Sequence, residues 1–407
     1  MSSKTKTTAT KEEATPALVP KLRFPEFQDT DDWQTKLLGD LCKIRTGKKD
    51  ANEGASDGQY PFFTCAENHI FSNSYSFDAE AILIAGNANV GQTRYYCGKF
   101  EAYQRTYVLT DFSGISVPYL YAVLNAKLRE SLLAQVQVSA MSYIKLPMLQ
   151  EYALAVPPSP AEQQKIAECL SSMDELMAAQ ARKVDALKTH KKGLMQQLFP
   201  REGETQPRLR FPEFQNAGEW VERLLESFIE EFRDKSTIQD EYEVMTSARS
   251  GLVRQREYYD NDRITERDNI GFNVIPPNYI TYRSRSDDRQ FYFNENNLGI
   301  TGIVSVYYPV FRVVNGSNRF LIELLSAFSR VVGKYSVGTS QTVLSLNQLG
   351  RIRLPFPPTM KEQQRIASCL SSLDALITAE TQKHEALKTH KKGLMQQLFP
   401  SPEEVGA

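Results

Sequence analysis

Cysteine is scarce in this chain, and its spacing argues against two common structural uses. The 407 residues contain five cysteines, and no two of them stand in a C-x-x-C pair. The odd count and wide spacing favour neither a structural zinc site nor a disulfide framework, so a reducing, cytoplasmic compartment is expected. The four histidines are not clustered with cysteines or carboxylates, so no metal site is predicted.

Long apolar runs and an excess of charge are also missing. No stretch approaches the roughly 20 apolar residues that cross a bilayer, and the first 17 residues lack the apolar core of a secretory signal. We expect residues 1–20 to be a flexible tail, because their composition cannot bury enough surface to fold. With 48 basic and 49 acidic residues, the formal net charge is −1. This balance argues against a protein that coats nucleic acid, but not against recognition through local basic patches.

Catalytic motifs are absent as well. The chain has no H-E-x-x-H, no G-x-S-x-G, no strand-linked G-x-G-x-x-G and no N-P-P-F-like methyltransferase motif. Residues 86–93 imitate a phosphate-binding loop, but Gln92 stands where the lysine is needed. We interpret this segment as a Gly/Asn-rich loop between strands, or alternatively as a loop that offers amides to base edges. The chain is therefore expected to perform no chemistry and to bind no cofactor itself.

What the chain does contain is a repeat. Residues 161–200 and 361–400 are identical at 28 of 40 positions, and their last 15 residues, ALKTHKKGLMQQLFP, match without interruption. A second repeated segment, LRFPEFQ, occurs at 22–28 and 209–215 and is followed by Trp33 and Trp220. We call the LRFPEFQ segment the opener and the region between each opener and the following repeat a module. The chain thus consists of an opener, a module and a repeat, and this order occurs twice.

Each repeat predicts a long amphipathic helix. Pro-rich segments at 156–160 and 355–358 precede the two copies, and both copies end at Phe-Pro. Apolar residues recur every three and four positions through five heptads, which is the pattern of a coiled coil. We expect the helices to pair antiparallel, with the modules at opposite ends of an approximate two-fold arrangement; packing of each helix on its own module alone is the alternative. We call this line of recurring positions, along which the helices would pair, the seam. Its polar residues either set the pairing register or turn toward solvent; these are Gln180, Lys191, Glu380, His384 and Lys391.

The rest of the sequence predicts two α+β modules that share one fold but differ on the surface. Strand-like runs at 81–85 and 106–109 and an amphipathic helix at 117–136 mark the first module. Runs at 300–308 and 310–314 and a helix at 319–332 mark the second, and each module ends in a polar loop, a short strand and the Pro-rich stop. The predicted divisions are a tail at 1–20, a module at 21–159, a helix at 160–200, a module at 201–359, a helix at 360–400 and a tail at 401–407.

Candidate binding residues are side chains that can contact nucleic acid. Arginine can donate two parallel bonds to guanine, and Asn or Gln can pair with adenine in the same way. Eight arginines lie between 249 and 289, among them Arg263 and Arg267, but seven acids share that stretch, so a salt-bridged surface is the alternative. The candidates in the first module are Arg45, Lys48, Lys49, Asn87, Asn89, Gln92, Arg94, Gln104, Arg105, Ser142 and Lys145; those in the second are Arg249, Arg254, Tyr282, Arg283, Arg285, Lys334 and Gln341.

The repeat also predicts a docking surface. Packing along the seam does not explain why several residues off the seam are identical in the two copies. We therefore expect one kind of partner to bind each copy; recent duplication is the alternative, although it would have left the modules alike too. The docking candidates are Lys188, His190, Lys192, Gln196 and Gln197 in the first copy, and Lys388, His390, Lys392, Gln396 and Gln397 in the second.

The chain resembles, over about residues 22–400, the specificity subunit of type I restriction–modification systems. The resemblance rests on Glu-Gln-Gln-Lys-Ile-Ala at 162–167, Glu-Gln-Gln-Arg-Ile-Ala at 362–367, the Pro-rich segments before them, the duplicated helix and the openers. It implies two target-recognition domains separated by two antiparallel helices, each domain reading one half of an asymmetric, bipartite double-stranded DNA site, with helix length setting the unread gap.

The resemblance also implies a division of labour among subunits. Two methylation subunits would carry S-adenosylmethionine, and restriction subunits would use ATP and Mg²⁺, while this chain carries no catalytic site. Two alternatives remain from the sequence. One is a coiled-coil adaptor that binds proteins but no DNA, and the other is a stand-alone nuclease or methyltransferase, which the missing motifs disfavour.

Overall fold

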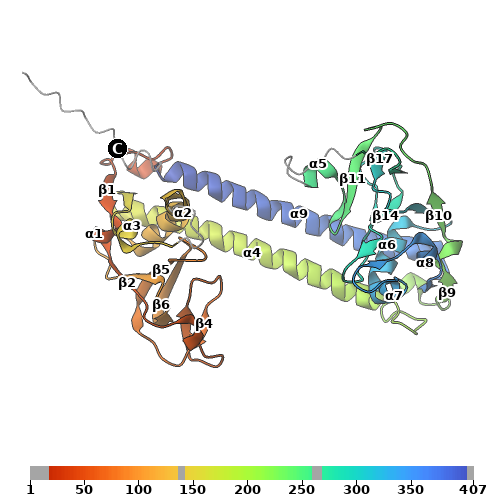
Figure 1. The fold of residues 1–407 in the computed structure, drawn as a ribbon, viewed down its shortest axis with the longest axis horizontal. Helices are drawn as coiled ribbons and strands as arrows, with labels where there is room; N and C mark the ends of the chain where they lie inside the picture. Colours follow the sequence, from red (N-terminus) through yellow and green to blue (C-terminus); the bar gives the residue numbers. More distant parts are fainter. Residues whose placement is uncertain (1–17, 136–142, 259–267, 401–407) are drawn as a thin grey trace, which may run out of the picture. The chain divides into compact units, whose positions relative to one another are not determined.

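The chain folds into two units, each containing parts of both repeat helices. The computed structural model describes residues 18–135, 143–258 and 268–400. One unit comprises residues 1–180 and 383–407, and the other comprises residues 181–382. Both boundaries fall inside the long helices α4 (Pro160–Leu198) and α9 (Met360–Leu398) (Figure 1). Each unit therefore holds one module, the start of the helix that follows it and the end of the other helix. Residues 1–17 and 401–407 of the predicted tails, with Ser142, Arg263 and Arg267, lie outside the described residues.

Both repeat helices form where the sequence predicts them. Pro160 is the first residue of α4, where its missing N–H costs nothing. The hydroxyls of Ser159 and Thr359 accept hydrogen bonds from the backbone N–H groups of Glu162 and Glu362 at 3.4 and 3.2 Å. These contacts satisfy one otherwise unpaired amide in the first turn of each helix, which fixes where the helix begins.

The helices run antiparallel wherever they meet inside a unit. In the second unit Lys183 pairs with Glu380 at 2.5 Å and Lys191 pairs with Asp374 at 2.7 Å, so advancing along α4 means moving back along α9. In the first unit Lys391 pairs with Asp174 at 2.5 Å. Gln180, another polar seam residue, is only 5% exposed. Lys191, Glu380 and Lys391 therefore pair across the helices, as a register-setting role requires, instead of turning toward solvent. His384 does not follow them, because its Nδ1 is buried without a hydrogen-bond partner among the described residues.

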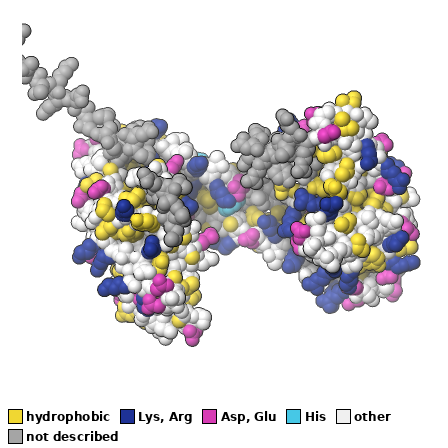
Figure 2. All heavy atoms as spheres, in the orientation of Figure 1, with side chains coloured by type: hydrophobic (Ala, Val, Ile, Leu, Met, Phe, Trp, Pro, Cys, Tyr) yellow, Lys and Arg dark blue, Asp and Glu magenta, His cyan; other side chains and the backbone are white. Residues whose placement is uncertain are grey.

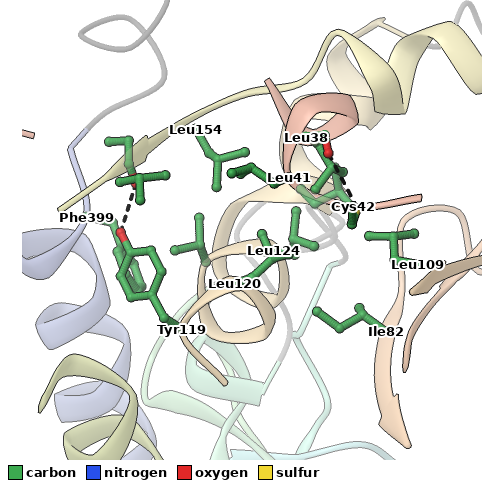
Figure 3. Close-up of a cluster of buried hydrophobic side chains, with 14 of the residues drawn as sticks. Leu38, Leu41, Cys42, Ile82, Leu109, Tyr119, Leu120, Leu124, Leu154 and Phe399 are labelled. Atoms are coloured by element: carbon green, nitrogen blue, oxygen red, sulfur yellow. Dashed lines mark hydrogen bonds between the residues drawn. The ribbon is translucent and has the colours of Figure 1, made fainter. Parts of the chain in front are cut away.

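The end of α9 is part of the core of the first unit. Leu398 and Phe399 join the same buried cluster as Trp33 and Tyr119, together with the start of α4. The rings of Tyr119 and Phe399 lie 6.0 Å apart in an edge-to-face arrangement, and the Tyr119 hydroxyl donates to the Ala155 carbonyl at 2.8 Å (Figure 3). Burying Phe399 alone is worth about 1.5–3 kcal/mol by area. The alternative in which each helix packs only on its own module is therefore wrong.

The second unit repeats this arrangement with the end of α4. Leu198 and Phe199 are buried with Trp220 and Phe320, and the Phe199 ring lies 6.2 Å from Trp220 and 5.9 Å from Phe320. Because the last 15 residues of the two repeats are identical, the same side chains pack against two different modules. Each module must therefore present an equivalent aromatic surface to them.

The first module is built around a six-stranded sheet in the order β2-β7-β5-β6-β3-β4. Strands β3 and β6 are parallel, and the other neighbouring pairs are antiparallel. Strand β1 pairs with β8 beside the start of α4. The elements are η1 (Pro25–Phe27), β1 (Gln34–Leu37), α1 (Leu38–Leu41), β2 (Lys43–Thr46), η2 (Ala51–Glu53), β3 (Tyr60–Phe63), β4 (Ile70–Ser72), β5 (Phe77–Ala85), β6 (Thr93–Ala102), β7 (Thr106–Thr110), α2 (Val117–Gln135), α3 (Leu146–Gln150) and β8 (Ala153–Val156).

The second module carries two four-stranded sheets, ordered β10-β18-β14-β16 and β12-β11-β17-β13, and two short strand pairs, β15-β19 and β20-β9. The elements are η3 (Pro212–Phe214), β9 (Val221–Leu224), η4 (Leu225–Ser227), β10 (Ile229–Phe232), β11 (Glu243–Ala248), β12 (Gly251–Arg254), α5 (Gln255–Tyr258), β13 (Asn273–Ile275), β14 (Ile280–Tyr282), β15 (Arg285–Ser286), β16 (Phe293–Glu295), β17 (Gly302–Val304), β18 (Val310–Val313), α6 (Asn318–Ala327), α7 (Ser329–Lys334), β19 (Thr342–Val343), α8 (Leu346–Gly350) and β20 (Arg353–Phe356).

The two modules share one topology, as the sequence predicts. The long hairpin β5–β6 corresponds to a hairpin that is broken in the second module, where β13 pairs with β17 and β14 pairs with β16. Pro276 and Pro277 interrupt the first of these arms, since proline lacks the N–H of a ladder bond. Asn296, which is fully buried, spans the break by donating to the carbonyls of Ile275 and Ile300 at 3.0 and 2.8 Å.

Local predictions agree with the structure in most places. The predicted strands at 81–85 and 106–109 lie in β5 and β7, and α2 buries the predicted apolar face. Two predictions in the second module need correction. The run at 300–308 yields only the short strand β17, and the helix at 319–332 is divided at Phe328 into α6 and α7. Phe328 ends α6 because its backbone leaves the helical region, with φ −99° and ψ 24°.

Candidate nucleic-acid interface

The openers and the Glu-Gln-Gln segments are explained by a buried polar cluster. In the first unit Arg23 donates to both carboxylate oxygens of Glu162 at 2.7 and 2.8 Å, and the Trp33 indole donates to the same carboxylate at 3.1 Å. We call this the Arg–Glu–Trp cluster. The two motifs are visible in the sequence, but their contact with each other was not predicted. The second unit repeats the cluster with Arg210, Glu362 and Trp220 at 2.7, 2.8 and 3.2 Å.

The cluster fastens each opener to the start of a repeat helix. The Glu162 side chain is 0% exposed, and its hydrogen bonds with Arg23 raise the pKa of the arginine. A buried carboxylate needs such partners, because removing an ion from water is otherwise expensive. These motif residues therefore hold each opener against the start of a repeat helix.

In the first module several candidate side chains meet at one end of the sheet. The loop after β5 is fastened by hydrogen bonds from the Gly86 N–H to the Arg105 carbonyl and from the Ile144 N–H to the Gly86 carbonyl, both at 2.9 Å. The Gln104 N–H donates to the Lys49 carbonyl at 2.9 Å. These backbone bonds bring the loops around 48, 87, 105 and 145 together. Arg45 lies elsewhere, because its guanidinium bonds to Thr110 at 3.0 Å.

Other candidates in the first module already have partners within it. Lys49 donates to Ser72 and Ser74 at 3.0 and 2.7 Å and lies 3.5 Å from the buried Glu101. The side chains of Asn89, Arg94 and Gln104 donate to the Cys65 carbonyl, the Ala66 carbonyl and Asp50 at 3.0, 2.6 and 3.1 Å. Contacts of this kind hold loops in place. Lys48, Arg105 and Lys145 are exposed, while Asn87 and Gln92 are half-buried.

In the second module the structure brings three candidate arginines around one hollow. Arg249, Arg283 and Arg285 line a cavity of about 280 Å³ together with Asp287, Asp288 and Tyr292. Each guanidinium also lies over a tyrosine ring: Arg249 over Tyr292 at 5.3 Å, Arg283 over Tyr308 at 6.0 Å and Arg285 over Tyr307 at 4.0 Å. Stacking of this kind restricts the guanidinium. Arg249 also pairs with Asp288 at 3.1 Å, and Arg283 donates from Nε to the Tyr308 hydroxyl at 3.1 Å. On the face shown in Figure 2, Lys and Arg side chains gather on this unit.

Tyr282 is not a nucleic-acid contact, contrary to the sequence prediction. Its side chain is 0% exposed, and its hydroxyl donates to the Leu344 carbonyl at 2.9 Å. It is the last residue of β14, and alternation along the strand turns it into the core while its neighbour Arg283 faces outward. Burial also raises the pKa of Tyr282.

The remaining candidates of the second module are spread over its surface. Arg254 pairs with Glu257 at 3.0 Å, and Lys334 pairs with Glu202 at 2.7 Å. Gln341 donates to Asp287 at 3.5 Å, at the border of the hollow. The salt-bridged alternative thus describes part of the arginine-rich stretch, since Arg256 also pairs with an acid, Glu243, at 3.3 Å.

All ten docking candidates on the repeat helices are exposed. Helical spacing divides them, however: His190 and Gln197 share one face, while Lys188, Lys192 and Gln196 lie on another. In the second unit this latter group lines a groove of about 850 Å³ that is also bordered by α7. The five equivalents in the second copy, from Lys388 to Gln397, have the same exposure.

Both helices also present to solvent a partly apolar stripe that was not predicted from the sequence. Between 173 and 185 only four positions match their equivalents between 373 and 385: 174, 176, 179 and 183. Asp174 and Lys183 are explained by ion pairs, whereas Leu176 and Leu376 are 47% and 41% exposed. Their spacing of three and four residues continues along one face, which we call the repeated stripe. It comprises Leu176, Ala179, Lys183, Ala186, His190, Gly193 and Gln197, with identical residues 200 positions later.

Within residues 18–135, 143–258 and 268–400, none of the helices is long and apolar enough to cross a membrane. Nor do three or more His, Cys, Asp or Glu side chains within the described ranges come together as a metal site would require.

Comparison with known proteins identifies the family. The family model described as "Type I restriction modification DNA specificity domain" matches residues 30–189 and again 231–389. The chain is 43% identical over 142 residues to the type I restriction enzyme EcoDI specificity subunit of Escherichia coli, a match that covers 35% of this chain and only 31% of that protein. It is 25% identical over 420 residues to the MjaVIII specificity subunit of Methanocaldococcus jannaschii, covering 93% of each chain.

Solved structures agree in fold. The S subunit of a type I restriction–modification system from M. genitalium superimposes with a TM-score of 0.62 at 16% identity, covering 94% of this chain and all of that one. A chain from a type I restriction–modification assembly gives 0.53 at 12% identity, covering 91% and 98%. Since the family model accounts for both modules and most of both helices, the chain belongs to the type I restriction–modification DNA specificity family, with two copies of its domain.

Proposed function

We propose that this chain gives a type I restriction–modification complex its DNA sequence specificity, with each module reading one half of an asymmetric bipartite site. One observation carries the proposal: the two modules share a topology and a repeated helical frame, yet their exposed loops differ in chemistry. The first module offers lysines, Arg105 and Asn87 at the end of its sheet, and the second offers three stacked arginines. Two modules with different DNA-binding surfaces on the same scaffold fit a DNA target whose two halves differ in sequence.

The repeat helices supply the docking sites for partner subunits in this proposal. The repeated stripe is exposed, partly apolar and identical in both helices, and internal packing does not require its leucines. Because the same surface is present on both helices, it fits two copies of one partner, the methylation subunit. That subunit would carry S-adenosylmethionine, while restriction subunits would join the complex and use ATP and Mg²⁺.

Assembly of the complex tests the docking sites. Replacing Leu176 or Leu376 by aspartate places a charge on an apolar contact, so each single variant should bind one methylation subunit in place of two. The double variant should bind none. The mass of the purified complex, measured by light scattering, distinguishes these stoichiometries. Because both leucines are largely exposed, the variants should unfold within about 0.5 kcal/mol of the parent.

The matched control places aspartate at an exposed helix position whose residue differs between the two repeats. Arg182→Asp and Gln382→Asp should leave two methylation subunits bound. If the double leucine variant also keeps both, the stripe is not the docking surface. The complete complex should in addition shift one duplex sequence from a random pool on a gel. A complex that assembles but binds every duplex equally would favour an adaptor without sequence recognition.

Helix length should set the unread gap between the half-sites. Inserting seven residues, one heptad, into the middle of both α4 and α9 preserves the seam and lengthens each helix by about 10 Å. We expect the gap in the methylated site to grow by about three base pairs, given about 3.4 Å per base pair, with both half-sites unchanged. Methylome sequencing reads all three quantities at once. Altered half-sites with an unchanged gap would contradict a spacer role.

A further inference from the structure

Two loops occupy the same place in the two modules, and their backbone contacts establish the correspondence. In the first module the Ile144 N–H donates to the Gly86 carbonyl at 2.9 Å, and the Tyr107 hydroxyl donates to the Ile144 carbonyl at 2.8 Å. In the second, the Leu344 N–H donates to the Ser284 carbonyl at 2.8 Å, and the Tyr282 hydroxyl donates to the Leu344 carbonyl at 2.9 Å. Gly86 therefore corresponds to Ser284.

The next residue of each loop continues the match. Asn87 forms an antiparallel bridge with Tyr143, and Arg285 forms an antiparallel pair with Val343. Each bridge partner immediately precedes the residue that receives the buried tyrosine bond. Asn87 and Arg285 therefore stand at equivalent positions of otherwise dissimilar loops.

Arg285 is held in place before any ligand arrives. Its guanidinium lies 4.0 Å from the centroid of the Tyr307 ring. Its strand neighbour Ser286 is fixed on both sides, because its hydroxyl donates to Asp288 at 2.7 Å and its carbonyl accepts from the Thr342 hydroxyl at 2.9 Å. A restrained arginine loses less side-chain entropy when it binds, which favours a geometrically demanding contact.

The carboxylates near Arg285 provide acceptors that a base edge can use and a phosphate cannot. Asp287 and Asp288 line the same hollow. Hydrogen bonds from Ser286 and from the Gln290 backbone lower the pKa of Asp288, so it remains a carboxylate at neutral pH. Asp288 pairs with Arg249 at 3.1 Å, and three arginines share the hollow with the two aspartates, so the charge of the hollow does not repel anions. Its carboxylates can, however, accept a hydrogen bond from cytosine N4, whereas a phosphate has no donor to offer them.

We propose that Arg285 and Asn87 are the equivalent specificity-determining residues of the two modules, Arg285 reading a guanine in one half-site and Asn87 reading an adenine in the other. Arginine matches the O6 and N7 acceptors of guanine, and asparagine matches the N6 donor and N7 acceptor of adenine, in both cases with two parallel bonds. This assignment rests on the proposed function and adds to it a chemical identity for one base pair in each half-site.

Reciprocal substitutions in the full chain, assembled with its methylation subunits, test the assignment. Methylome sequencing gives the wild-type motif, and binding to duplexes that vary one base pair at a time measures preference. Arg285→Asn should convert one guanine position to adenine and weaken binding to the original duplex by roughly 5- to 150-fold, the usual discrimination of a bidentate pair. The other half-site should not change. Asn87→Arg should act in the same way on the other half-site, from adenine to guanine.

Conservative variants separate base reading from other roles. Arg285→Lys keeps the charge but replaces the planar guanidinium fork by a single flexible ammonium group, so it should weaken the guanine preference. Tyr307→Phe keeps the ring and should keep the preference, whereas Tyr307→Ala should reduce it. If Arg285→Ala instead weakens binding to every duplex equally and lowers the salt dependence by about one ion, Arg285 contacts a phosphate and the assignment is overturned. A wild-type complex without any sequence preference would overturn the proposed function itself.

Discussion

Replacing Glu162 by alanine is expected to lower the free energy of unfolding of the first unit by about 3–5 kcal/mol, the range for breaking a buried ion pair from one side. The substitution leaves the Arg23 guanidinium, 6% exposed, without its carboxylate. It also removes the acceptor of the Trp33 indole. Urea unfolding followed by tryptophan fluorescence measures the effect, because the chain has only two tryptophans, Trp33 and Trp220. In a Trp220→Phe background, Trp33 reports the first unit alone.

Three variants control the measurement on Glu162. Glu162→Gln keeps an acceptor for Arg23 and should be destabilised less than alanine. The combined replacement of Arg23 by Met and Glu162 by Leu removes both charges and should recover much of the loss, since an apolar pair leaves no buried ion. Glu362→Ala should affect Trp220 in a Trp33→Phe background by a similar amount. A loss below about 1 kcal/mol for Glu162→Ala would mean that water replaces the carboxylate and that the cluster contributes little.

Residues 1–200 alone are expected to form a homodimer. The first module needs the side chains of Leu394, Met395, Leu398 and Phe399 to complete its core, and the same four residues end the first repeat at 194–199. One copy can therefore supply its α4 end to the module of the other. The seam permits this, because Asp174 of one copy can pair with Lys191 of the other, as it does with Lys391 in the intact chain. Light scattering at several concentrations measures the mass.

Phe199→Ala provides the control for dimerisation. In the fragment this change should cost about 3–5 kcal/mol per copy and shift the protein toward monomer. In the intact chain the same change acts on the core of the second unit, where Phe199 packs on Trp220 and Phe320. A fragment that stays monomeric at high concentration with a native circular dichroism spectrum would contradict the prediction, because it would show that the module does not need a helix end from elsewhere.

The long helices and the shared topology could be predicted because their signals are repetitive. A heptad pattern sustained over five heptads is hard to reconcile with any structure other than a long helix. Helices α4 and α9 also begin where the preceding Pro-rich segments predict. The pairing of Lys191 with Asp374 could not be read from the repeat, since a lysine at a seam position is equally compatible with a solvated helix. Only the position of the partner helix decides between them.

The individual binding residues were harder to predict because side-chain direction and local partners decide exposure. Tyr282 and Arg283 are adjacent and polar, yet strand alternation buries the first and exposes the second. Lys49 looks like a basic loop residue, but Ser72, Ser74 and Glu101 surround its ammonium group. The equivalence of Asn87 and Arg285 has no sequence signal, because the two loops differ in length and composition. It follows only from hydrogen bonds to residues far along the chain.

The identical ends of α4 and α9 have a consequence for how such proteins evolve. Phe199 and Phe399 are both buried against aromatic side chains of two unlike modules, so the junction accepts either module. Homologous recombination between the repeated gene segments, within one gene or between relatives, would exchange whole modules while leaving every core contact at the junction intact. A lineage could acquire a new DNA recognition sequence in a single genetic event, without a compensating mutation.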